Sequence, residues 1–198
     1  MRRLYARAVL AAALAISPSW VCGANYDESV NGDLSGVPAT PTDWALDIGA
    51  NVLKGSAGTS SDYDLFTFTI PAGHQLDTLT LDSYVVQGYA SFLGLQTGST
   101  WTAGLGWLVN GESLLGWDLF DVGFVGTNRL PQIALNGNTI SPQFTPPLGS
   151  GTYTALLQDT ATSYNYQFTF NVSAVPEPAT LGIAAVGLIG IARLARRR

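Results

Sequence analysis

Apolar and polar residues alternate with a period of two along much of this chain. The clearest run places apolar side chains at every second position from Tyr164 to Val172, with Asn165, Gln167, Thr169 and Asn171 between them. This alternation is typical of a strand with one buried face. We therefore expect a strand over 164–172 whose aromatic face belongs to the core.

A second alternating run surrounds the turn Pro71-Ala72-Gly73. Apolar residues alternate with threonines over 66–70 before the turn, and the pattern resumes with leucines over 79–81 after it. Proline and glycine at the centre favour a tight reversal of the chain. The pattern predicts a hairpin with its aromatic side inward.

Further strand candidates lie at 51–54, 90–96, 117–122 and 151–158, separated by short clusters of Gly, Asn, Pro and Ser. No stretch between them shows a convincing amphipathic helix, although 105–115 is ambiguous. Short strands at close intervals are typical of sandwiches. We expect an all-β fold, a single antiparallel, jelly-roll-like β-sandwich over residues 25–174.

The pattern changes at the C-terminal end. Residues 179–192 carry no charge, and their apolar members include Ala179, Leu181, Ile183, Val186, Leu188, Ile189 and Ile191. Fourteen helical residues span about 21 Å, against about 30 Å for a bilayer core, so this is a short membrane anchor. Four arginines follow as a stop-transfer signal and keep the end of the chain cytoplasmic, namely Arg193, Arg196, Arg197 and Arg198.

The tail resembles a known sorting signal. Val175-Pro176-Glu177-Pro178 precedes the apolar run and the arginines, and this order resembles the PEP-CTERM sorting signal of bacterial surface proteins over 175–198. The resemblance implies processing by an exosortase, a membrane-embedded cysteine protease. It also implies a protein anchored first in the membrane and then placed at the cell surface or outside the cell. The same type of tail stands at the C-terminus of some ice-binding proteins.

The N-terminal end predicts export as well. Arg2, Arg3 and Arg7 precede an apolar segment at 8–16, and small residues at 22–24 suit a leader peptidase, so we expect a signal peptide over 1–24. A lipoprotein would instead retain Cys22. If the single cysteine leaves with the leader, the mature chain can form neither a disulfide nor a thiolate metal site.

Charge is distributed unevenly. Seven of the nine cationic residues lie in the leader and tail. Between residues 25 and 175 there remain two cationic residues, Lys54 and Arg129, and thirteen acidic ones, which gives this part of the chain a net charge near −11. Such a surface repels polyanions, which excludes nucleic acid as a partner. Binding of an acidic polysaccharide would need divalent cations between the two.

The segment after Ser61 carries a second resemblance. The pattern Asp62-x-Asp64-x-Phe66-x-Phe68, with the turn at 71–73 and the later segment 149–160, is similar to the bacterial pre-peptidase C-terminal domain, a small β-sandwich. The stretch 101–145 does not match and looks like an insertion. In related collagen-binding domains, aspartates near this strand take part in calcium binding. The resemblance therefore implies Asp62 and Asp64 as metal ligands, the alternative being solvated turn residues. We expect no other cofactor.

Catalysis has little support in the sequence. The single histidine, His74, follows a turn and has no recognisable catalytic partner. A carboxylate pair for glycoside hydrolysis could only come from acids near the tryptophans, such as Glu112, Asp118 and Asp121. We expect a protein that is not an enzyme.

Two functions remain. The first is a structural component of the cell surface or extracellular matrix. The second is a carbohydrate-binding module for exopolysaccharide, in which Trp101, Trp107 and Trp117 stack on sugar rings. The same tryptophans could instead fill the core. Ice binding would require a flat face of regularly spaced threonines, and the pairs at 67/69 and 78/80 are too few to predict one.

Overall fold

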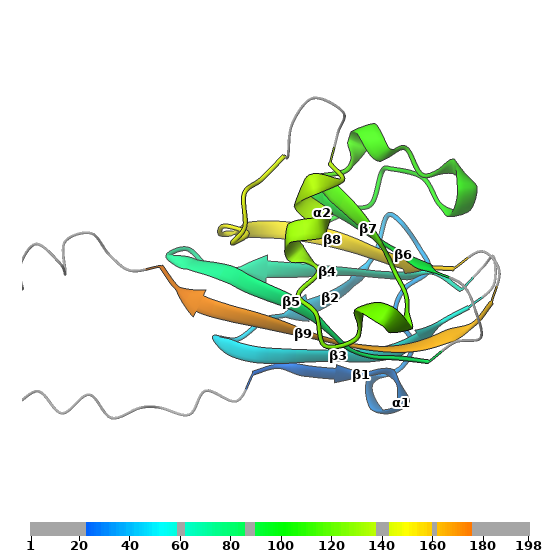
Figure 1. Ribbon diagram of the computed structural model, residues 1–198, viewed down its shortest axis with the longest axis horizontal. Coiled ribbons are helices and arrows are strands. Elements are labelled where there is room, and N and C mark those ends of the chain that lie inside the picture. Colours follow the sequence, from blue (N-terminus) through cyan, green and yellow to red (C-terminus); the bar gives the residue numbers. More distant parts are fainter. Residues whose placement is uncertain (1–22, 59–61, 86–89, 138–142, 160–161, 176–198) are drawn as a thin grey trace, which may run out of the picture.

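Two β-sheets lie face to face in the part of the protein that the computed structural model describes, residues 23–58, 62–85, 90–137, 143–159 and 162–175 (Figure 1). The strands are β1 (Asn25–Asp27), β2 (Thr42–Ala45), β3 (Gly49–Ala57), β4 (Asp64–Ile70), β5 (His74–Val85), β6 (Ser91–Thr97), β7 (Gly116–Phe120), β8 (Gly151–Gln158) and β9 (Tyr164–Ala174). The helical elements are α1 (Glu28–Asn31), α2 (Leu130–Leu135) and the 3-10 turns η1 (Gly106–Leu108), η2 (Gly111–Ser113) and η3 (Val122–Phe124).

Strand β9 is central in the first sheet, whose strand order is β1-β3-β9-β5. It pairs antiparallel with β3 on one side and with β5 on the other. The second sheet has the order β2-β4-β8-β6-β7, in which the pairs β4–β8, β8–β6 and β6–β7 are antiparallel. This arrangement of two facing sheets agrees with the expected β-sandwich.

The alternation in β9 is confirmed. The five apolar side chains from Tyr164 to Val172 are each at most 2% exposed, whereas the polar residues between them are exposed or half-buried. Phe170 meets the edge of Trp44 at 5.1 Å and of Phe68 at 5.3 Å between ring centroids, so the two sheets interlock through aromatic rings. Each such fully buried side chain contributes roughly 1.5–3 kcal/mol to folding.

The expected hairpin at Pro71–Gly73 is wrong. Strand β4 belongs to the five-stranded sheet and β5 to the four-stranded sheet, so the turn carries the chain across the sandwich. His74 N–H donates to the Pro71 carbonyl oxygen at 3.1 Å, and Gly73 takes the positive φ of 76° that the turn requires. Alternation predicts only that both strands bury one face, and two strands that face each other across a core satisfy it as well as a hairpin does.

Two edge strands also depart from the antiparallel expectation. β1 pairs in parallel with β3, and β2 pairs in parallel with β4. They contain three and four residues, which is too short for a recognisable alternation. The N-terminal part of the chain thus supplies one edge to each sheet.

The segment between β6 and β7 covers the outer face of the five-stranded sheet. Leu65 and Leu156 are opposite each other on β4 and β8, point away from the main core and are completely buried. Trp101, Ala103 and Leu114 from the covering segment pack on them. Because this sheet is buried on both faces here, β4 and β8 show runs of buried residues instead of alternation.

The last described residue and the start of β4 lie far apart in the sandwich. Val175, the last described residue, donates its backbone N–H to the Gly73 carbonyl oxygen at 2.8 Å, so the chain leaves the sandwich beside the turn after β4. Asp64 begins β4, and the length of that strand, about 20 Å, separates it from Ile70 and the turn that follows. Val175 and the start of β4 are therefore at opposite ends of the domain.

The outer cluster makes a prediction about stability. Leu156→Ala should lower the free energy of unfolding by about 2–5 kcal/mol, because it leaves a cavity between β8 and Trp101. Urea denaturation of the variant measures this loss. The matched control is Leu108→Ala on η1, which is 83% exposed and should change stability by about 0.5 kcal/mol or less. Equal effects of the two changes would mean that the covering segment is not part of the folded core.

Candidate functional site

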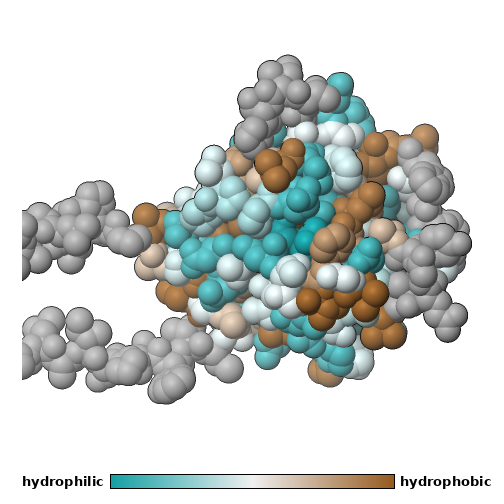
Figure 2. Space-filling model, in the orientation of Figure 1, coloured by the Kyte–Doolittle hydropathy of each residue, from teal (hydrophilic) through white to brown (hydrophobic). Residues whose placement is uncertain are grey.

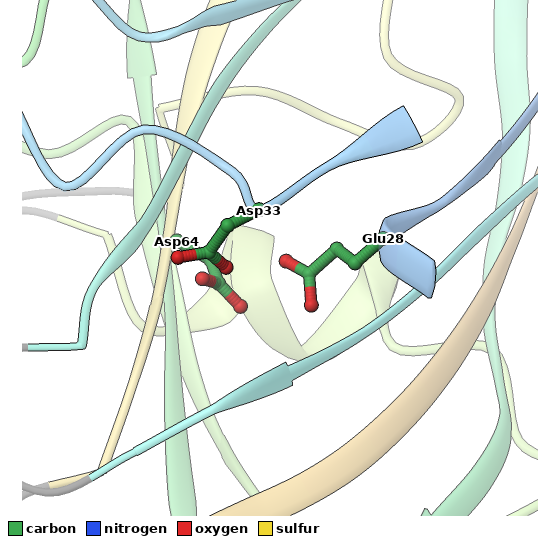
Figure 3. Close-up of side chains that lie close together, drawn as sticks. All are labelled: Glu28, Asp33 and Asp64. Carbon is green, nitrogen blue, oxygen red and sulfur yellow. The ribbon is translucent and has the colours of Figure 1, made fainter. Parts of the chain in front are cut away.

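Three carboxylates converge at the end of the sandwich that lies away from Val175. Glu28 comes from α1, Asp33 from the loop after it and Asp64 from the start of β4. One carboxylate oxygen from each residue lies within 4.8 Å of the others, and the three groups point toward one another (Figure 3). We call these residues the carboxylate centre.

Local turns bring the first two members together. Asp27 caps α1 by accepting a hydrogen bond from the Ser29 backbone N–H, and Gly32 ends the helix with a φ of 93°. A positive φ reverses the chain at little cost in glycine, which places Asp33 beside Glu28. The next residues are then fixed to the sheet, since Leu34 is buried and the Leu65 N–H donates to the Ser35 carbonyl oxygen at 2.9 Å.

Backbone groups hold the Glu28 carboxylate. Its two oxygens accept hydrogen bonds from the N–H groups of Ser56, at 2.7 Å, and Leu34, at 3.3 Å. Gly55 is required at this point, because a Cβ there would lie 2.6 Å from the Tyr166 hydroxyl and 2.5 Å from the Glu28 carboxyl carbon. Burial raises the pKa of Glu28, although the two backbone hydrogen bonds act in the opposite direction.

Asp64 is the buried member of the centre. Its side chain has no exposed surface, and Oδ2 accepts a hydrogen bond from the Tyr166 hydroxyl at 2.7 Å. Oδ1 is buried and has no hydrogen-bond partner in the part of the chain that the structure describes. Loss of hydration, and then the charge of Glu28, raise the pKa of Asp64 to about 9. Without a cation, this carboxyl group therefore holds a proton at neutral pH.

Neither cation of the exported domain is at this site. Lys54 pairs with Asp27, with 3.0 Å between Nζ and Oδ2. Arg129 pairs with Asp118 on β7, with 2.6 Å between Nε and Oδ2. The centre thus gathers negative charge and only oxygen donors. Oxygen-only sites of this charge suit hard divalent cations such as Ca²⁺ or Mg²⁺.

The sequence-based expectation for this site was incomplete. Asp64 belongs to the centre, whereas Asp62 lies nearby and acts on Glu28 and Asp64 through its charge. Burial, and then the charge of Asp33, raise the pKa of Asp62. Glu28 and Asp33 were missed, although the acid-rich stretch before the first long strand was a visible signal.

The three tryptophans are not equivalent. Trp101 is 3% exposed within the outer cluster and donates its Nε1–H to the Gly104 carbonyl oxygen, so of the two alternatives it fills the core and is not a stacking platform for sugar rings. Trp107 lies in η1. Trp117 on β7 is half-buried and stacks on Phe92, with ring centroids 6.1 Å apart. Of Trp101 and Trp117, only Trp117 therefore presents part of its surface to a ligand, and the side chain of Trp107 lies outside the described part of the structure.

Trp117 also lines a cavity of about 420 Å³ at the free edge of β7. Its other lining residues are Asp118, Leu119, Phe124, Arg129, Gln132 and Asn136. Arg129 is buried against Asp118 and lies over the Phe124 ring at 4.1 Å from its centroid. Apolar side chains of η3, including Val122 and Phe124, form an exposed patch beside it (Figure 2). The cavity combines aromatic, apolar and amide groups.

Comparison with protein families adds the tail. Residues 174–198 match the family described as the PEP-CTERM protein-sorting motif. The chain carries a PEP-CTERM motif. This motif implies export and sorting through an exosortase, which confirms the resemblance found in the tail. The match covers 25 of the 198 residues, so it describes the tail and not the sandwich.

The comparisons do not extend beyond the PEP-CTERM motif. Searches of curated proteins and of solved structures gave no match, and the resemblance of the core to the pre-peptidase C-terminal domain is not confirmed. Among the described residues, no helix is long and apolar enough to cross a membrane. The predicted anchor at 179–192, its arginines and most of the signal peptide lie outside those residues.

The carboxylate centre predicts how stability depends on pH in chelator. The pKa of Asp64 is about 9 in the folded protein and 3.8 ordinarily, so between these values the folded state keeps a proton that the unfolded state loses. The stabilisation is complete below pH 4 and is lost as the pH rises through 9, with a slope of up to about 1.4 kcal/mol per pH unit. Glu28 and Asp62 add to the decline, because their pKa values are also raised.

Urea unfolding in EDTA from pH 5 to pH 9 measures this decline. Asp64→Asn should flatten it, because the amide cannot ionise and its oxygen can still accept the Tyr166 hydroxyl hydrogen bond. Identical slopes for the wild type and the variant would show that Asp64 is ionised in the metal-free protein.

Proposed function

We propose that this protein is an exported structural component of the cell surface or extracellular matrix, delivered through its PEP-CTERM tail. The observation that carries the proposal is the direct connection between the sorting motif, which begins at residue 174, and β9, which ends there. Because β9 is paired along both edges, a pull on the tail is spread over two rows of backbone hydrogen bonds. Such a connection suits a domain that must stay folded while attached.

In this proposal the tail acts in two steps. The apolar run at 179–192 first holds the exported domain at the membrane, and the arginines after it stay on the cytoplasmic side. An exosortase then processes the tail near the Pro-Glu-Pro motif, which places the domain at the surface or in the matrix.

The positions of the acidic residues near the tryptophans favour a role without catalysis. Asp118 is held by Arg129, Asp121 caps η3 by accepting a hydrogen bond from the Gly123 N–H at 2.7 Å, and Glu112 is exposed on η2. A general acid and a nucleophile for glycoside hydrolysis would have to face a common substrate cleft. These three acids have separate structural surroundings instead.

Cell fractionation tests the proposed sorting. The full chain should appear as a processed form at the surface or in the matrix of cells that contain an exosortase, and as an unprocessed membrane form in cells that lack it. A chain without residues 175–198 should be exported but not retained. If the protein has the same distribution among membrane, surface and medium in all three cases, the tail does not direct the protein and the proposal fails.

Carbohydrate binding is a second candidate, favoured by the cavity beside Trp117. Gln132 and Asn136 supply amide groups that can donate and accept hydrogen bonds with hydroxyl groups, next to an aromatic ring. The cavity volume of about 420 Å³ lies within the range of roughly 300–1,000 Å³ typical of ligand sites. Because Arg129 is neutralised by Asp118 and the domain is strongly acidic, the matching ligand is a neutral glycan.

Affinity electrophoresis in gels that contain neutral or acidic polysaccharide tests this candidate. A neutral glycan should retard the protein, and Trp117→Ala should weaken the binding by roughly three- to tenfold, as expected for one lost aromatic contact. Leu135→Ala, an exposed position on α2, is the matched control and should bind normally. Unchanged mobility of the wild type in every gel would leave only the structural role.

A further inference from the structure

The Asp64 carboxyl group is buried, and among the described residues it has no partner of opposite charge. It is fully buried, one oxygen is satisfied by Tyr166, and the other oxygen has no hydrogen-bond partner. Burying a carboxylate is costly unless the group is paired, hydrogen-bonded or bound to a metal. The free oxygen belongs to a group that faces two further carboxylates, Glu28 and Asp33 (Figure 3).

We propose that Glu28, Asp33 and Asp64 form a calcium site that fastens the N-terminal segment to the sandwich. Their oxygens, within 4.8 Å of one another, are close enough to contact one ion. A bound cation supplies the missing partner for the buried oxygen of Asp64 and offsets the repulsion among the three carboxylates. This site is independent of the proposed sorting function.

The donors indicate which cation binds. They are all carboxylate oxygens, which select hard cations over the softer transition metals. Calcium accepts irregular sets of six to eight oxygens, whereas magnesium requires a nearly ideal octahedron. Asp33 is exposed and Asp64 is buried, so the centre is open to solvent on one side and water can complete an irregular coordination sphere. Calcium sites in extracellular modules typically bind with Kd values of about 10⁻⁴–10⁻³ M.

The cation would join segments that are distant in the sequence. Glu28 and Asp33 belong to the N-terminal segment, and Asp64 begins a strand of the five-stranded sheet. Asp64 in turn accepts a hydrogen bond from the Tyr166 hydroxyl on β9 of the four-stranded sheet. Glu28 accepts one from the Ser56 backbone N–H on β3. Calcium at this point therefore closes one end of the sandwich, where the N-terminal segment meets both sheets.

Calcium titration of the purified full chain tests the site. Calcium at millimolar concentration should raise the melting temperature above that measured in EDTA. Tb³⁺ bound in place of calcium should luminesce when tyrosine is excited, because the Tyr166 hydroxyl is hydrogen-bonded to Asp64. Hydrogen exchange of residues 26–35 should slow when calcium is added.

Three variants separate a metal site from a simple acidic cluster. Asp64→Asn should abolish the calcium effect while the protein stays folded in EDTA. Asp33→Asn, at an exposed position, should weaken calcium binding by roughly tenfold. Asp43→Asn removes one exposed charge outside the centre and should bind calcium normally. The proposal is overturned if calcium leaves the wild-type melting temperature unchanged, or if all three variants respond to calcium as the wild type does.

Discussion

The packing of the aromatic face of β9 against the five-stranded sheet is the interaction on which the rest of the structure depends. The exported domain has no cysteine after residue 22, so this core has to hold the sheets together without a disulfide. Phe168 and Phe170 fix the sheets at the middle of the strand, and Tyr166 reaches Asp64 near its start. The same strand leads into the PEP-CTERM motif at its end. Core, carboxylate centre and tail are thus connected through one element.

The sequence predicted those parts of the fold that depend on local periodicity. The range 151–158 coincides with β8, and the alternation in 164–172 corresponds to the buried face of β9. Periodicity states which side of a strand is buried, but not which strand it pairs with. For this reason the turn at Pro71–Gly73 was misread as a hairpin. Trp101 was ambiguous for a similar reason, because burial on the outer face of a sheet depends on a covering segment that periodicity does not show.

The carboxylate centre was only half visible in the sequence. Asp64 stands in a recognisable pattern at a strand entry, whereas Glu28 and Asp33 precede it by more than thirty residues. They reach it because β1 pairs in parallel with β3 and because Gly32 turns the chain back at the end of α1. Neither feature leaves a strong signal in a single sequence. The burial of Asp64, which gives the site its chemistry, is a property of the packed sheets alone.

The two proposals place attachment at one end of the domain and cation binding at the other. A crystal structure of the protein grown with calcium tests the account most directly. We expect an ion between Glu28, Asp33 and Asp64, with oxygen distances of about 2.3–2.6 Å and a direct contact to Asp64 Oδ1. Electron density that shows only water beside Asp64 at saturating calcium, with the three carboxylates unchanged, would contradict it.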